Sequence, residues 1–203
     1  ENRRPPVAVA ADSRLAVLHL GVVQGEIGPG RYDRAAWTAW FARVGSAPDV
    51  ATLVGYDRGE HPTTVRLHAL PTSKSGEEVN VTLDVLVRVG APERLTTLLP
   101  GGQGTLDEAV VAQAIADFLH GPVSEVAARH PASGVAAVLD RSALQKALAG
   151  PCHTSGIEVT IRSLRAENPA WRDESRVRRL VEQLRVALMR RRLVRARGAE
   201  AAL

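Results

Sequence analysis

Residues 63–92 read TTVRLHALPTSKSGEEVNVTLDVLVRVGAP, and no other part of the chain says as much about its architecture. Over the second half of this stretch an apolar side chain occupies every second position, which is the period of a strand with one buried face. Only Leu86 breaks the alternation, and residues 65–69 alternate in the same way before the polar run at 72–78. We therefore expect a long hairpin. Its inward side chains are predicted to be Val79, Val81, Leu83, Val85, Val87 and Val89.

One more strand of this kind occurs much later, at residues 157–164, which read IEVTIRSL. Its polar side chains at positions 158, 160 and 162 are expected to point outward. We expect this strand to join the sheet of the hairpin. Its inward side chains are predicted to be Ile157, Val159, Ile161 and Leu164.

The remaining first half of the chain also has the patterns of strands. Apolar runs predict strands at residues 15–20 and 50–56, and the glycine-rich stretch 21–31 predicts two strands with tight turns. One helical turn is an alternative for residues 33–43, but we interpret them as a surface loop that turns its aromatic side chains inward. Those side chains are Trp37, Trp40 and Phe41.

Beyond residue 92 the apolar period changes from two to about 3.6, which indicates helices. Residues 105–108, TLDE, form a predicted capping box in which the Thr105 hydroxyl accepts from the amide of Glu108. The glycines at 101–104 are expected to be a flexible entry to this helix, rather than a phosphate loop, which has a lysine. The helix is expected to end at the Gly-Pro pair 121–122.

Three further helices are predicted. Two are short, over residues 123–129 and 140–148, and the second of them is closed by the Gly-Pro pair at 150–151. The third covers about residues 173–192, after the late strand.

Composition narrows the possible functions. With 203 residues and 45% hydrophobic residues the chain can bury a sizeable core, and only 3% of the residues are aromatic. The core must therefore be aliphatic, and side chains on which bases or sugars stack are scarce. These values argue against a protein that binds carbohydrate or single-stranded nucleic acid.

Positive charge is concentrated near the end of the sequence. The formal net charge is +4, and residues 176–197 contain nine arginines against one acid, Glu182. Such a segment attracts the phosphates of lipids or of nucleic acid. The alternative is a solvated face, or one that pairs with acids of a neighbouring copy.

No pattern of catalytic or metal-binding residues is present. Cys152 is the only cysteine, and because His153 is adjacent to it, their side chains diverge and do not form a nucleophile and base pair. The six histidines lack metal-ligand spacing. We therefore predict a protein without catalytic residues, cofactor or metal.

The order of these segments resembles the SPFH or band 7 domain, the family of stomatin, prohibitin, flotillin and bacterial relatives. The likeness covers about residues 18–171. The segments that resemble the family are GVVQGEIGPGRY at 21–32, VNVTLDVLVRVGAP at 79–92, EAVVAQAIADFL at 108–119, DRSALQKAL at 140–148 and GIEVTIRSLRAENP at 156–169.

The resemblance implies an α+β fold, in which helices pack on a curved antiparallel or mixed sheet and a C-terminal helix follows. It implies a flexible lead over residues 1–13, the domain over 14–171 and an arginine-rich helix over 172–203. Relatives carry a hydrophobic anchor before the domain and a long coiled coil after it. This chain shows neither, and we expect that a preceding segment has been removed. A soluble assembly, similar to the shoulder domain of vault particles, is the alternative.

The C-terminal helix contains the predicted site residues. Apolar residues at 4-3-4 spacing form the seam of a short coiled coil, which packs on a neighbouring copy or on its own domain. The seam consists of Val177, Val181, Leu184 and Leu188. An anionic surface such as lipid headgroups would be bound by Arg190, Arg191 and Arg192.

These features predict a non-enzymatic scaffold that assembles into a ring or cage and organises a membrane patch or an unidentified client protein. It is expected at a membrane, through a segment that this chain does not contain. A soluble basic adaptor that binds nucleic acid through the arginine-rich helix is a less favoured alternative. A hydrolase that uses Cys152 ranks below both.

Overall fold

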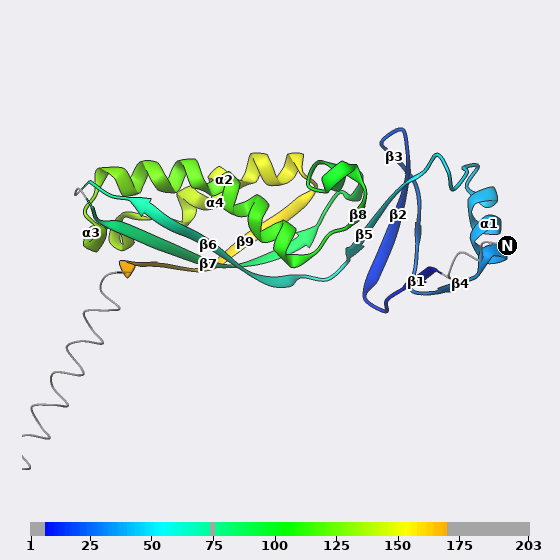
Figure 1. Ribbon diagram of the computed structural model, residues 1–203, viewed down its shortest axis with the longest axis horizontal. Helices are drawn as coiled ribbons and strands as arrows, with labels where there is room; N and C mark the ends of the chain where they lie inside the picture. Colours follow the sequence, from blue (N-terminus) through cyan, green and yellow to red (C-terminus); the bar gives the residue numbers. More distant parts are fainter. Residues whose placement is uncertain (1–6, 74–75, 170–203) are drawn as a thin grey trace, which may run out of the picture.

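The computed structural model describes residues 7–73 and 76–169. Helices and strands make up nearly equal shares of them, about 39% and 38%, which confirms an α+β fold. The described part is elongated, with a helix-covered sheet at one end and smaller sheets at the other (Figure 1).

The predicted hairpin forms the centre of the larger sheet. β6 (His61–Pro71) pairs with β7 (Glu78–Val89) in antiparallel register. Five of the six predicted inward side chains of β7 are buried, and Val89 is partly buried against the same core. Leu86, the exception in the pattern, lies half-buried on the other face. The alternating pattern therefore identified this hairpin and its buried face correctly.

The late strand joins this sheet as predicted. β9 (Ile157–Glu167) pairs antiparallel with β7, which gives the strand order β6-β7-β9. Its start depends on Gly156, which has a φ of 75°, and a Cβ there would lie 2.2 Å from the Ala91 carbonyl oxygen. The amides of Gly90 and Ala91 both donate to the Gly156 carbonyl. Only glycine fits this joint between the end of β7 and the start of β9.

Three helices cover one face of the sheet (Figure 1). α2 (Glu108–Arg129) packs on β6 and α4 (Arg141–Thr154) packs on β9, while the short α3 (Ala132–Val138) lies between them in sequence. The buried helix side chains meet the valines of β7 in one aliphatic core. They include Val111, Ile115, Leu119, Val123, Val135, Leu144 and Leu148.

The start of α2 differs from the predicted capping box. Asp107 is the N-cap, and its side chain accepts a 2.8 Å hydrogen bond from the Val110 amide. Thr105 belongs instead to β8 (Gly104–Thr105), which runs parallel to a strand of the first half. The glycines before it form a short 3-10 turn, η2 (Pro100–Gly102), after η1 (Pro92–Thr97). The entry to α2 therefore consists of a 3-10 turn and a two-residue strand.

The Gly-Pro pairs do not end the helices. Pro122 lies inside α2, so the predicted helix over 123–129 is its continuation, and Pro151 lies inside α4. Proline inside a helix costs about 3 kcal/mol or more. Val123 and Ala127, which follow the first proline, are buried, and so is Cys152, which follows the second. Burying a side chain of valine size stabilises the fold by about 1.5–3 kcal/mol. Continued packing therefore offsets the interruption.

The first half forms two smaller sheets. β2 (Ser13–His19), β3 (Val22–Ile27) and β5 (Thr52–Asp57) form a sheet with the order β3-β2-β5-β8. β1 (Val7–Val9), within the expected lead, pairs with β4 (Gly30–Tyr32). The strands expected at 15–20 and 50–56 are confirmed. The glycine-rich stretch yields two strands, but they pair with β2 and β1.

Residues 33–43 form a helix, so the loop prediction was wrong. α1 (Arg34–Arg43) begins after Asp33, whose carboxylate accepts a 2.8 Å hydrogen bond from the Ala36 amide. Its aromatic side chains do point inward, because Trp40 and Phe41 are buried in a second small core with Val17. The segment is helical because Asp33 caps it and the aromatic pair fills one of its faces.

The sheet β3-β2-β5 separates the two cores. Val17 belongs to the small core with α1, whereas its neighbours Ala16 and Leu18 belong to the large core under the helices. Val54 and Tyr56 of β5 also face the large core. β2 and β5 therefore join both ends of the described part.

Candidate functional site

The larger sheet has one face that no described element covers, and we call it the open face. It lies opposite α2 and α4 (Figure 1). The burial of β7 alternates along its length, with buried residues toward the helices and half-buried or exposed residues, mostly polar, toward the open face. Its charged members come from all three strands. They include Arg66, Glu78, Asp84, Arg88, Glu158, Arg162, Arg165 and Glu167.

Asp84 lies at the centre of the open face. Its carboxylate accepts hydrogen bonds from Ser163 Oγ at 2.5 Å, Arg165 Nη2 at 2.9 Å and Thr64 Oγ1 at 3.3 Å. The hydrogen bond from Ser163, followed by that from Arg165, lowers the pKa of Asp84. At neutral pH the group is an ionised acceptor, with partners on both neighbouring strands. It ties the three strands together and is a poor proton acceptor.

A bulge in β9 creates this arrangement. Ile161 pairs with Val85 and Ser163 pairs with Asp84, so Arg162 is an extra residue. The bulge turns Ser163 and Arg165 toward the open face, while Leu164 packs against the core. Nearer the start of β9, Arg88 and Glu158 form an exposed ion pair with 2.5 Å between Nη2 and Oε2.

A side chain closes part of one sheet edge, and a bulge interrupts the strand at the other edge. The Gln145 amide donates to the Val159 carbonyl at 2.5 Å and accepts from the Ile161 amide at 2.9 Å, so α4 caps the outer edge of β9. On β6, a bulge places Ala69 at a φ of 53°, and its amide donates to Asn80 Oδ1 at 2.9 Å. Caps and bulges of this kind disfavour the addition of a further strand.

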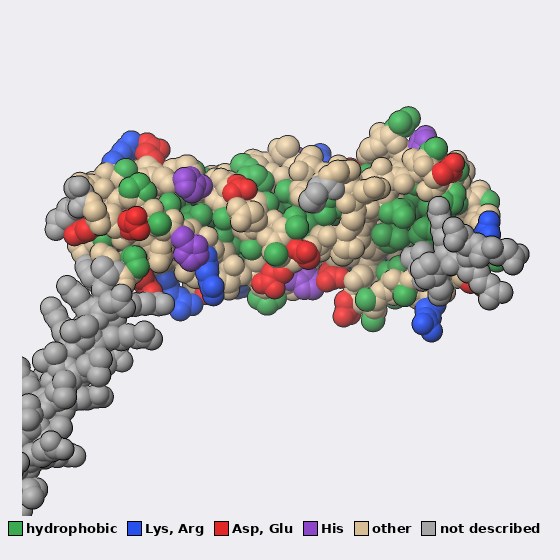
Figure 2. All heavy atoms as spheres, viewed as in Figure 1, with side chains coloured by type: hydrophobic (Ala, Val, Ile, Leu, Met, Phe, Trp, Pro, Cys, Tyr) green, Lys and Arg blue, Asp and Glu red, His purple; other side chains and the backbone are tan. Residues whose placement is uncertain are grey.

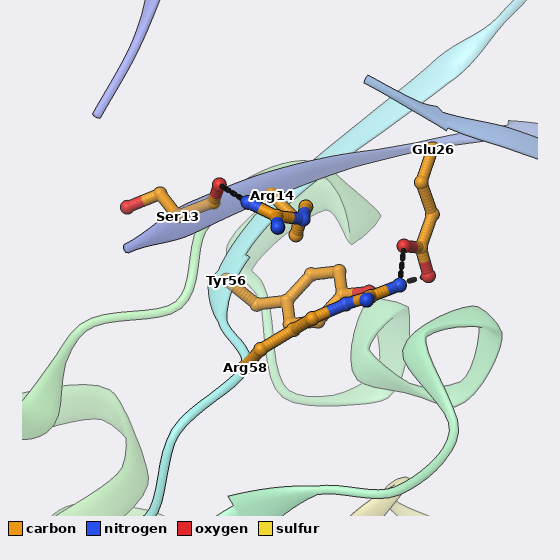
Figure 3. A network of polar contacts seen from close by, with 5 residues as sticks. All are labelled: Ser13, Arg14, Glu26, Tyr56 and Arg58. Atoms are coloured by element: carbon orange, nitrogen blue, oxygen red, sulfur yellow. Dashed lines mark hydrogen bonds and ion pairs between the residues drawn. The ribbon is translucent and has the colours of Figure 1, made fainter. Parts of the chain in front are cut away.

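A second polar cluster, the junction network, lies on the sheet β3-β2-β5 (Figure 3). The Tyr56 hydroxyl donates to Glu26 Oε1 at 2.6 Å, and Arg58 Nη2 donates to Glu26 Oε2 at 2.5 Å. Arg14 lies beside them and donates to the Ser13 carbonyl at 3.0 Å. Ala16, the β2 partner of Glu26, carries only a methyl group, which leaves room for these side chains to meet over β2.

The junction network fixes the protonation of its members. Burial would raise the pKa of Glu26, but the hydrogen bonds from Tyr56 and Arg58 and the positive charges of Arg58 and Arg14 lower it overall. Burial, together with the Glu26 carboxylate, raises the pKa of Tyr56 to about 12. The carboxylate is therefore charged and the phenol neutral at physiological pH. The network acts as a structural joint between β3 and β5.

The turn between β2 and β3 exposes apolar side chains. Leu20 is 91% exposed and has a φ of 50°, and Gly21 after it has a φ of 78°. Val22 is 61% exposed. Two successive positive φ angles are typical of a type I′ turn, whose first position favours Asn, Asp or Gly. Leucine is an unusual occupant of this position.

Cys152 and His153 do not form a reactive pair. Cys152 is buried in α4, and burial raises the pKa of its thiol to about 11. The exposed His153 ring lies 3.2 Å from Arg94 Nη1 instead. Among residues 7–73 and 76–169, no side chain forms a hydrogen bond with the thiol. The thiol is therefore protonated at neutral pH and poorly nucleophilic.

Neither a metal site nor a membrane-spanning helix is found in the described part of the chain. No three His, Cys, Asp or Glu side chains of residues 7–73 and 76–169 lie close enough together to hold a metal ion. Of the helices that the structure describes, none has the length and hydropathy that crossing a membrane requires.

The site residues predicted from sequence lie outside the described residues. These are the seam residues Val177, Val181, Leu184 and Leu188, and the arginines 190–192. They remain predictions. Two features that sequence reasoning missed are the Gln145 cap and the junction network. The members of each come from separate segments, and nothing in the local patterns signals that they meet.

Comparisons with known proteins do not extend this description. No protein-family model matches the sequence, and no curated protein matches it either.

Proposed function

We propose that this chain is a non-enzymatic scaffold of the SPFH or band 7 type, which packs side by side with copies of itself and organises a membrane patch or partner proteins. The observation that supports this most is the difference between the two long sides of the elongated body. One side is a layer of helices, and the other is the open face of β6-β7-β9 (Figure 1).

Two unlike sides suit a heterologous contact. In such a contact one surface of a copy meets a different surface of the next, which generates rings or filaments. The Gln145 cap on the edge of β9 and the bulge in the edge strand β6 disfavour assembly by strand pairing. Copies that associate would therefore use faces of the body instead.

The positions of the two chain ends support the same arrangement. Residue 7 lies at the end of the body with β1 and α1, and residue 169 follows β9 at the opposite end (Figure 1). Both long sides of the described part lie between these two ends (Figure 1). In this proposal one segment attaches the body to a membrane, and the C-terminal seam, Leu184 and Leu188 included, strengthens the contact between copies.

The state of the ionisable groups supports a role without catalysis. Asp84 and Glu26 are charged and held by hydrogen bonds, which leaves them little basicity. Tyr56 and Cys152 keep their protons well above neutral pH. These groups join strands or fill the core, which is the behaviour of a structural module.

Light scattering on the purified 203-residue chain tests this proposal. We expect particles much larger than a 21.7 kDa monomer, and their mass should rise with protein concentration. Replacing Leu184 and Leu188 by Asp should reduce that mass, whereas Gln183→Asp, beside the seam, should not. A monomer at high concentration would contradict the proposal. Retention on DNA that Arg190→Ser, Arg191→Ser and Arg192→Ser together abolish would favour the adaptor instead.

A further inference from the structure

We propose that the end of the sheet β3-β2-β5 inserts apolar side chains into the surface of a lipid bilayer. The inserting residues are Leu20, Val22 and Val50, which we call the tip cluster. This inference deepens the proposed function, because it names a lipid contact inside the folded part. The inference depends on the proposed scaffold function only for the binding of many copies to one membrane.

The first observation is that the three side chains gather at one end of the sheet. Thr52 pairs with Leu18, so Val50 lies two residues beyond the last pair of β5 and β2, at the end where Leu20 turns the chain. Val22 pairs with His19 directly after that turn. Figure 1 shows the β2–β3 turn projecting from the body, and Figure 2 shows hydrophobic side chains at that projection.

The second observation is the exposure of these side chains. Leu20 is 91% exposed, Val22 is 61% exposed and Val50 is 57% exposed. Only four large hydrophobic side chains of the described residues are exposed in this way, and three belong to the tip cluster. Isolated exposed hydrophobic residues are common, but a cluster on a projection marks an interaction site.

The third observation is the backbone of Leu20. Its φ of 50° is in the left-handed region, where every residue except glycine, asparagine and aspartate is disfavoured. A type I′ turn accommodates asparagine better than leucine, and asparagine is also more soluble. The chain therefore places an apolar side chain at a point where both folding and solubility favour a polar one. Strain of this kind is typical of functional sites.

The chemistry around the cluster favours lipid over a protein groove. From Leu15 to Gly25 the sequence contains no Asp, Glu, Lys or Arg, so the hairpin offers no ion pair that would orient a protein partner. The cluster is also convex, because it sits on a turn that projects from the body. A convex apolar tip fits a fluid hydrocarbon phase, which needs no matching shape.

A charged residue next to Val50 refines the choice of lipid. Asp49, directly before Val50, carries an exposed carboxyl group. It is repelled by anionic headgroups and tolerated by neutral ones. The tip cluster should therefore bind vesicles of neutral phosphatidylcholine and should keep that binding in high salt. Binding through the arginines at 190–192 would show the opposite dependence on lipid charge and salt.

The test is flotation of the full chain with phosphatidylcholine vesicles in 0.1 M and about 1 M salt, which screens exposed charges. Leu20→Asn is expected to lower the partition coefficient about tenfold, since it removes most of one side chain's transfer free energy. This variant keeps a turn residue that tolerates positive φ, so unfolding does not explain the loss. Val138→Asn, at the exposed end of α3, is the matched control and should bind as the parent chain does.

A second measurement locates the contact. Val22→Trp should lose fluorescence with vesicles of brominated lipid by more than the parent chain, which has tryptophan at positions 37, 40 and 171. Three results would overturn the inference. These are no binding to neutral vesicles, binding that Leu20→Asn leaves unchanged, and a Leu20→Asn variant that loses its assembled mass in light scattering while it still binds vesicles. A monomeric chain that binds neutral vesicles through Leu20 would contradict the scaffold but support the tip.

Discussion

The Tyr56 hydroxyl donates a 2.6 Å hydrogen bond to the Glu26 carboxylate, and so ties β5 to β3 over the strand between them. Tyr56 is buried against the large core, while Glu26 is also held by Arg58 from the solvent side. The bond therefore couples the packing of the large core to the sheet that carries the tip cluster.

Removing the phenol oxygen should weaken this joint. Tyr56→Phe is expected to lower the free energy of unfolding by about 1.5–3 kcal/mol, the range for a hydrogen bond to a charged group. Urea unfolding of both proteins measures the difference. Tyr32→Phe is the control, since its hydroxyl donates to the neutral Gly28 carbonyl at 3.1 Å and should cost only about 0.5–1.5 kcal/mol. Equal losses of stability in both variants would show that the charge of Glu26 does not strengthen the Tyr56 hydrogen bond.

Replacing Gly156 should be among the most damaging changes in the chain. Gly156→Ala places a Cβ 2.2 Å from the Ala91 carbonyl oxygen and forces a positive φ on alanine. The φ alone costs about 1–2 kcal/mol, and the steric clash adds to it. Gly150→Ala is the matched control, because nothing lies within 4 Å of its Cβ inside α4, and a gain of about 0.5–1 kcal/mol is expected. Thermal unfolding should separate the two variants clearly.

Leucine at position 20 should cost stability. Leu20→Asn is expected to raise the free energy of unfolding by up to about 1 kcal/mol, because asparagine adopts positive φ more readily. Leu20→Val should lower it, since a branched Cβ is less compatible with that backbone. If chemical denaturation finds the asparagine variant less stable than the parent chain, Leu20 packs better than its 91% exposure indicates.

The Gln145 cap should protect the edge of β9. Gln145→Glu can still accept from the Ile161 amide but cannot donate to the Val159 carbonyl. A loss of about 1–3 kcal/mol is expected, with faster hydrogen exchange at Ile161. Gln113→Glu tests whether any added charge has this effect. Gln113 is exposed on α2 and donates to Asp117, and a loss below about 0.5 kcal/mol is expected. Similar exchange at Ile161 in both variants would exclude an edge cap.

Stability should fall in alkaline solution. The pKa values of Cys152 and Tyr56 rise from about 9 and 10 to about 11 and 12 on folding. A raised pKa means that the stabilisation is complete below the unfolded value and is lost as the pH rises through the folded value. The free energy of unfolding should therefore decline between about pH 9 and about pH 12, first through Cys152 and then through Tyr56. Cys152→Ala should reduce that decline, and a reactive thiol in the native protein at pH 8 would contradict the assignment.

The sequence predicted the sheet better than the helices. Alternation over residues 79–89 identified β7 and its buried face, because a period of two is repeated there over five pairs of residues. In β9 the change of spacing between Ile161 and Leu164 is where the bulge lies. Periodicity is a local property, so it predicts a strand reliably when one face of that strand is buried.

The errors arise where contacts between distant segments decide the structure. Pro122 and Pro151 are strong local signals for a helix end, yet burial against β6 and β9 extends both helices past them. Residues 33–43 have a weak apolar pattern, and their helix depends on contacts with Val17 of β2. The junction network likewise joins Glu26 to Tyr56, thirty positions away. A single sequence does not reveal these pairings.

The described part begins at one end of the body, with β1, and finishes at the opposite end, after β9. This arrangement has a mechanical consequence. A row of copies packed by their long sides would possess two unlike rims, one lined by β1 and α1 and the other by the end of β9. The body would then serve as a spacer of fixed length, because the strands and helices that span it do not stretch. Whatever is tethered at one rim would be held at a constant height from whatever is tethered at the other.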